Sequence, residues 1–148
     1  MQHTQLTEIY SIHSNASLTQ CEIPLFVASV SAGFPSPAED YEEGPLDLNT
    51  YLIPHPAATF FVRVSGDSMK EAGIFPRDLL IVDRSVTPVS GKIIIAVLDG
   101  ALTVKRLRRH SKHKIVLEPE NPEYQAILVN ENQQFEVWGV VTHVIHSV

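Results

Sequence analysis

The chain has 148 residues, of which 44% are hydrophobic and 19% are charged, enough for one domain with a buried core. Its formal net charge of −6 argues against the chain as a whole being a polyanion-binding protein. A single cysteine, Cys21, excludes an internal disulfide and offers no paired zinc ligands.

The charges divide the chain into two parts. Residues 1–50 contain seven acidic residues and no Lys or Arg, whereas residues 51–148 carry ten acidic and eleven basic residues. Residues 1–50 show no sustained helical or strand period, so we expect an extended acidic N-terminal arm before a β-rich domain at 51–148. The alternative is a disordered acidic tail, and the apolar residues between Ile23 and Val30 argue against it.

No segment predicts a membrane span or a secretory signal. In the second part the longest apolar run is Ile93 to Leu98, far below the ~18 residues of a spanning helix. Leu25 to Ala32 ends like a signal-peptide cleavage site, but acidic residues precede it where a signal peptide needs positive charge. We therefore expect a cytoplasmic protein with no membrane partner.

Short β-rich runs follow residue 51, separated by Gly, Pro, Asp and Asn. They predict strands at 59–65, 79–83, 92–98, 101–107, 114–118 and 136–145. Asp99–Gly100 lies between two of these runs and predicts a tight hairpin. A short helix is expected from Ser68 to Ala72, ended by Gly73. The pattern indicates a mostly β fold.

Ser68 and Lys105 are the candidates for chemistry. In Ser65–Gly66–Asp67–Ser68–Met69 a strand ends at a turn that can expose a hydroxyl beside backbone N–H groups. Ser68 could equally be a helix cap, since the Gly-x-Ser-x-Gly hydrolase motif is absent. On the strand that contains Lys105, alternation does not decide whether Lys105 or Arg106 points inward. A buried lysine would have a lowered pKa suited to a general base.

The resemblance to a known family is more specific. Gly66–Asp67–Ser68–Met69 with Thr103–Val104–Lys105 resembles the LexA/UmuD family of self-cleaving serine–lysine peptidases. Further segments resemble its UmuD branch: GFPSPAEDY at 33–41, DLN at 47–49, His55–Pro56, DLLIVD at 78–83 and WGVVTHV at 138–144. The resemblance implies a mostly β peptidase domain of short, strongly bent sheets with one short helix, preceded by an extended N-terminal arm.

The resemblance also implies roles for named residues. Ser68 would be the nucleophile and Lys105 the general base, with the backbone N–H groups of Asp67 and Ser68 as the oxyanion hole. The bond cut would be Ala32–Gly33, where UmuD has Cys before the scissile bond. Pro24, Leu25 and Phe26 resemble the arm segment that contacts the replicative sliding clamp, although packing of the arm onto its own domain explains them equally well.

The function implied is self-cleavage in the SOS DNA-damage response, the trimmed homodimer then serving an error-prone translesion polymerase. The implied partners are the RecA filament on single-stranded DNA, a UmuC-like polymerase subunit and the sliding clamp, with no cofactor and no metal. Alternatives are a LexA-type or phage-type repressor fragment, a peptidase acting on other proteins, and a non-catalytic protein-binding module. Direct specific DNA binding is not expected, because no helix-turn-helix pattern and no cation precede Gly33.

Overall fold

A computed structural model of the chain describes residues 5–11, 20–26, 32–35 and 42–148. The chain divides into two compact units. One comprises Met1–Ser14 with His55–Val148, and the other comprises Asn15–Pro54. Ser68 and Lys105 belong to the first unit, and Ala32 and Gly33 belong to the second.

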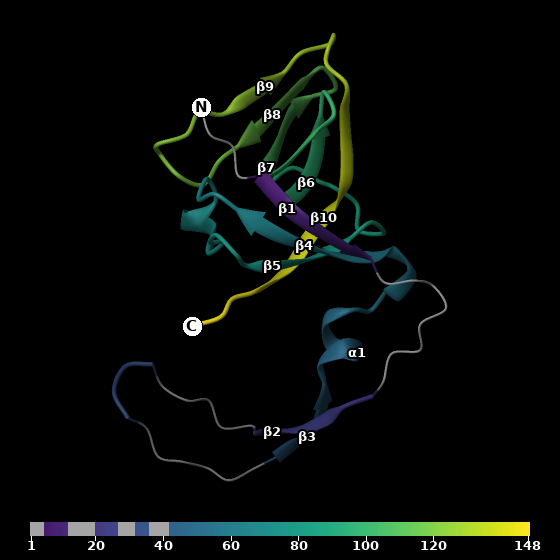
Figure 1. Cartoon of the computed structure of the whole chain (residues 1–148), viewed down its shortest axis with the longest axis vertical. Coiled ribbons are helices and arrows are strands. Elements are labelled where there is room, and N and C mark those ends of the chain that lie inside the picture. The colour runs from purple at the N-terminus through teal and green to yellow at the C-terminus, as the bar shows by residue number, and fades with distance from the viewer. Residues whose placement is uncertain (1–4, 12–19, 27–31, 36–41) are drawn as a thin grey trace. The chain divides into compact units, whose positions relative to one another are not determined.

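The first unit is built on one antiparallel sheet of eight strands in the order β1-β4-β5-β10-β6-β7-β8-β9 (Figure 1). Its strands are β1 (Gln5–Ser11), β4 (Thr59–Ser65), β5 (Leu79–Asp83), β6 (Ile93–Leu98), β7 (Ala101–Ser111), β8 (Lys114–Glu118), β9 (Ile127–Val129) and β10 (Phe135–Ile145). The mostly β fold class predicted from the sequence is confirmed, and the 59–65, 79–83 and 114–118 strands have the predicted bounds.

Strand β10 joins the two halves of this sheet. Its first half pairs with β6 and its second half with β5, and the register shifts twice, between Val137 and Gly139 and between Val141 and His143. Such irregularities bend a strand and increase its twist. Gly139 lies at the first of these irregularities. A larger residue would clash there, because a Cβ would lie 2.7 Å from Val82 Cγ1. The bent strand lets one sheet curl around two cores.

The two cores lie on opposite faces of β6. Ile95 belongs to a cluster with Phe60, Val62, Met69 and Leu80, among others. Its neighbours Ile94 and Ala96 belong to a second cluster with Leu107, Leu117 and Val140. Since successive side chains of a strand point to opposite faces, the fully apolar run of β6 is explained by burial on both sides.

The hairpin predicted at Asp99–Gly100 is confirmed. Leu98 pairs with Ala101, so Asp99 and Gly100 are the two loop residues between β6 and β7. Both have positive φ, 49° and 80°, which is the backbone of a type I′ turn. This turn sets the register of β7 and therefore the direction in which Lys105 points.

Strand β1 is the main difference from the sequence-based expectation. It runs antiparallel to β4, with Leu6 opposite Val64 and Ile9 opposite Val62. A register shift between Leu6 and Glu8 places one extra residue between those pairs. The bulge interrupts the period-two alternation, which is why the sequence pattern does not reveal this strand.

The second unit contains β2 (Glu22–Phe26), β3 (Glu42–Asp47) and the helix α1 (Leu48–Leu52). The two strands pair antiparallel, and Asp47 caps α1 by accepting a hydrogen bond from the Asn49 backbone N–H at 3.0 Å. None of these three elements was expected within the arm. No helix in the described ranges is long and apolar enough to cross a membrane.

Candidate active site

The Ser68 turn follows β4 directly. Gly66 has a φ of 79°, which glycine adopts readily, and it reverses the chain before Ser68. The short helix expected from Ser68 begins later: it is a single 3-10 turn, Lys70–Ala72, with Met69 as its N-cap and Gly73 (φ 76°) after it. The prediction that Ser68 opens the helix is therefore wrong, while the stop at Gly73 is confirmed. Ser68 is fully buried.

Lys105 lies on β7 and points into the core beside Ser68. Its Nζ donates hydrogen bonds to Ser68 Oγ at 3.1 Å, Thr103 Oγ1 at 2.9 Å and the Val104 carbonyl at 3.1 Å. The side chain of Lys105 is 0% exposed. Arg106, the other candidate for the inward position, forms an ion pair with Glu120 instead. The structure thus brings the predicted nucleophile and base into direct contact.

Burial lowers the pKa of Lys105 from 10.5 to about 8, because the charged form loses its hydration. In the described part of the chain no carboxylate forms an ion pair with this lysine that would restore the charged form. A sizeable fraction of neutral amine is therefore present slightly above pH 7. A neutral amine 3.1 Å from a hydroxyl can accept its proton.

The segment Glu120–Tyr124 braces the Ser68 turn, a role that its sequence does not predict. The Glu120 N–H donates to the Ser68 carbonyl at 2.8 Å, and Asn121 Nδ2 donates to the Asp67 carbonyl at 3.0 Å. The Tyr124 hydroxyl donates to Asp67 Oδ1 at 2.6 Å. The only sequence signal for this segment is its Pro-Glu-Asn-Pro turn composition.

The remaining predicted site residues lie in the second unit. Ala32 and Gly33 form a short exposed bend with Phe34, whose side chain is 92% exposed. Pro24 and Leu25 lie exposed on β2, opposite Pro45 and Gly44. Phe26 is the last residue of β2. The predicted cleavage site and the surface of β2 at Pro24 and Leu25 are therefore both exposed.

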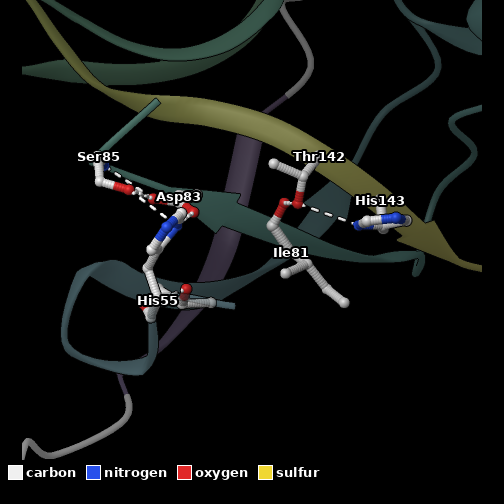
Figure 2. Close-up of polar contacts among 7 residues, drawn as sticks. His55, Ile81, Asp83, Ser85, Thr142 and His143 are labelled. Atoms are coloured by element: carbon white, nitrogen blue, oxygen red, sulfur yellow. Dashed lines mark hydrogen bonds and ion pairs between the residues drawn. The ribbon is translucent and has the colours of Figure 1, made fainter. Parts of the chain in front are cut away.

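A second cluster of Ser, His and Asp stands at the end of β5 (Figure 2). His55 Nδ1 donates to Asp83 Oδ2 at 2.7 Å, and the same Nδ1 is 3.0 Å from Ser85 Oγ. Ser85 Oγ in turn donates to Asp83 Oδ1 at 2.5 Å. In a catalytic triad the serine and the aspartate contact opposite nitrogens of the imidazole. Here both contact Nδ1, so the cluster holds Asp83 and does not activate Ser85.

The other histidines do not assemble a metal centre in the described residues. His143 Nδ1 contacts Thr142 Oγ1, as Figure 2 shows, and His146 Nδ1 pairs with Asp78 Oδ1 at 2.5 Å. Asp78 is buried, and its Oδ2 accepts a hydrogen bond from the Phe75 N–H. His146 is therefore the partner of a buried carboxylate.

The basic run 105–114 is distributed over different structural roles. Lys105 is buried beside Ser68, and Arg106 and Arg108 form ion pairs with Glu120 and Glu118. The cations left exposed, Arg109, Lys112 and Lys114, lie at the β7–β8 hairpin end. Three of the six cations in this run are therefore buried or held in ion pairs.

Several known proteins are similar to this chain over most of its length. The Peptidase S24-like family model matches residues 24–142. The chain is 52% identical to protein SamA of Salmonella typhimurium over 128 residues, covering 86% of this chain and 88% of SamA. It is 43% identical to protein MucA of Escherichia coli over 122 residues, covering 82% of each.

The LexA repressor of Bordetella avium is a third relative, 40% identical over 136 residues that cover 88% of this chain and 62% of the repressor. The family match includes the Ser68 turn, Lys105 and the segment that braces the turn. This chain belongs to the Peptidase S24-like family.

Proposed function

We propose that the protein is a self-cleaving serine peptidase in which Ser68 and Lys105 cut the Ala32–Gly33 bond. One observation carries the proposal: a buried lysine without a carboxylate partner among the described residues places its amine 3.1 Å from a serine hydroxyl. Membership of a peptidase family supports the reaction type.

The reaction follows from these groups. Ser68 Oγ adds to the Ala32 carbonyl carbon while its proton passes to neutral Lys105, and the backbone N–H groups of Asp67 and Ser68 stabilise the oxyanion. The bond to Gly33 then breaks, and the Lys105 ammonium returns the proton to the Gly33 amine. Water hydrolyses the ester of Ala32 on Ser68, again with Lys105 as the base. The products are residues 1–32 and 33–148.

The same proposal includes a cellular role. The trimmed chain would act as a homodimeric accessory subunit of an error-prone translesion polymerase after DNA damage. Its partners would be the RecA filament on single-stranded DNA as activator, a UmuC-like polymerase subunit, and the sliding clamp through Pro24–Phe26. The resemblance to the UmuD branch supports this role, and so does the exposure of Pro24 and Leu25 on β2.

Intact-mass spectrometry of the purified chain tests the chemistry. With a Lys105 pKa of about 8, the neutral fraction rises about ten-fold from pH 7 to pH 9 and changes little above that. The species 33–148 should therefore form about ten times faster at pH 9 than at pH 7, and then reach a plateau. A lysine with an ordinary pKa near 10.4 would give a rate that still rises through pH 10.

Two serine variants provide matched controls. Ser68→Ala should remain whole at every pH, whereas Ser85→Ala, which alters the second cluster, should be cut like the wild type. Cleavage of Ser68→Ala, or loss of cleavage in folded Ser85→Ala alone, would show that the wrong serine has been assigned. A second assay adds RecA filaments on single-stranded DNA at pH 7. Unchanged cleavage rates there would count against the proposed activator.

A further inference from the structure

The peptide groups on both sides of Ser68 are held through their carbonyls by one segment, Glu120–Asn121. The Asp67 carbonyl accepts from Asn121 Nδ2 at 3.0 Å, in addition to the Lys70 N–H at 3.2 Å. The Ser68 carbonyl accepts from the Glu120 N–H at 2.8 Å, and the Glu120 carbonyl accepts from the Glu71 N–H at the same distance. The turn and the segment are thus bonded in both directions.

Holding a carbonyl also sets the direction of the N–H on the same peptide. The peptide group is planar, and in its trans form the C=O of one residue and the N–H of the next point in opposite directions. The peptides of the described residues are trans. Asn121, by holding the Asp67 carbonyl, therefore fixes the direction of the Ser68 N–H, which is one of the two proposed oxyanion donors.

Asn121 is itself held firmly. Only 3% of it is exposed, and its Oδ1 accepts from the Glu123 N–H at 3.0 Å while its Nδ2 donates to Asp67. Both ends of the amide are therefore committed, and the side chain cannot turn without losing a hydrogen bond. A donor fixed in this way keeps the Asp67–Ser68 peptide from rotating.

Tyr124 holds Asp67 through the Asp67 side chain. Its hydroxyl donates to Asp67 Oδ1 at 2.6 Å. The Asp67 carboxylate that accepts this hydrogen bond raises the pKa of Tyr124, so the phenol keeps its proton to higher pH than an ordinary tyrosine. The contact therefore persists over the alkaline range in which Lys105 becomes neutral.

Glu120 connects this segment to the strand of the base. Its carboxylate forms an ion pair with Arg106, the residue after Lys105, and Arg106 also donates to the Gly91 carbonyl at 2.7 Å. The segment is thus bonded to both the turn of the nucleophile and the strand of the base. The position of this segment therefore affects how Ser68 and Lys105 lie relative to each other.

We propose that Asn121, supported by Tyr124, is a positioning residue that orients the Ser68 N–H toward the oxyanion formed in self-cleavage. The inference rests on the proposed function of Ser68 and Lys105. The role it assigns to Asn121 is to set the direction of a backbone donor through the Asp67 carbonyl.

The test is the pH profile of self-cleavage in Asn121→Leu, which replaces the amide by a branched apolar group with the same number of heavy atoms and adds no charge. The matched control is Asn130→Leu, the same change at an exposed residue. Loss of one oxyanion donor slows peptidases about 10²–10³-fold. Misorientation of such a donor should slow Asn121→Leu by about 10- to 100-fold at every pH, with the midpoint still near that of the wild type.

The possible outcomes separate the two proposals. Wild-type protein that stays whole at every pH overturns the proposed function together with this inference. Wild-type cleavage with an equal rate in folded Asn121→Leu overturns the inference alone. A rate loss accompanied by an upward shift of the midpoint also overturns it, because Asn121 would then act through Lys105.

Tyr124→Phe keeps the inference testable if Asn121→Leu fails to fold by circular dichroism. This variant removes a single oxygen, and we expect cleavage about three- to ten-fold slower with an unchanged midpoint. A wild-type rate in Tyr124→Phe would then overturn the proposal.

Discussion

The first unit contains two polar clusters, each with a serine and a buried ionisable group. One cluster favours the neutral form of that group and the other favours its ionised form. At Ser68 the buried group is Lys105, which has hydroxyl and carbonyl partners but no ion pair with a described carboxylate. At Ser85 the buried group is Asp83, which accepts hydrogen bonds from the Ser85 N–H, the Ser85 hydroxyl and His55.

The pKa shifts express this difference. Burial lowers the pKa of Lys105 to about 8, so the group favours its neutral form. Burial also acts on Asp83 and would raise its pKa, but the hydrogen bonds from Ser85 and His55 outweigh burial and the net shift is downward. The first cluster is therefore suited to proton transfer, and the second holds a stable carboxylate.

The largest expected effect is on the pH dependence of stability, compared between Ser68→Ala and the double variant that also carries Lys105→Met. The Ser68→Ala substitution prevents cleavage during the measurement. Between about pH 8 and 10.5 the unfolded chain still binds the lysine proton that the folded chain has lost, so stability rises with pH. The rise amounts to about 3 kcal/mol at most. Urea unfolding across this pH range should show it in Ser68→Ala.

The double variant should lack this rise, because methionine does not titrate. In a chain that keeps Ser68, Lys105→Met alone should stop self-cleavage entirely. An equal pH dependence of stability in the single and double variants would show that Lys105 has no depressed pKa, and the contrast between the clusters would fail.

Asp83→Asn should produce an intermediate effect. The substitution removes a negative charge that accepts three hydrogen bonds. It should lower the unfolding free energy by about 1–3 kcal/mol at pH 7, while self-cleavage keeps its wild-type rate. The ionised Asp83 stabilises fully above its ordinary pKa of 3.8 in the unfolded chain and less as pH falls through its lower folded-state pKa. The difference from wild type in urea unfolding should therefore shrink at pH 3. A large loss of cleavage in the folded variant would give this cluster a catalytic role.

His55→Gln should have the smallest effect. The side chain of His55 is 55% exposed, so its contact with Asp83 is open to solvent. We expect a loss of about 0.5–1 kcal/mol at pH 7, measured by urea unfolding. A loss as large as that of Asp83→Asn would mean that His55, and not the Ser85 donors, is the principal partner of the carboxylate.

Local pattern predicted six of the eight strands in the sheet of the first unit. The runs at 59–65, 79–83 and 114–118 are rich in β-branched residues bounded by turn residues, and Asp99–Gly100 specifies its hairpin through two residues that tolerate positive φ. Strands β1 and β9 escaped notice, the first because of its bulge and the second because it has three residues. β1 and β9 are the two outermost strands of the sheet, and each pairs with an edge that the other strands form.

The mostly β class, the Gly66 and Gly73 turns and the two candidate residues could be predicted from the sequence, since they depend on short-range pattern and a recognisable motif. The tertiary structure was needed to show that Lys105 and not Arg106 points inward, because both faces of β7 contain apolar residues and the choice depends on what packs against each. It also brought Asn121 and Tyr124 to Asp67, more than fifty residues away along the chain. Such contacts follow from strand order and register, which local pattern does not encode.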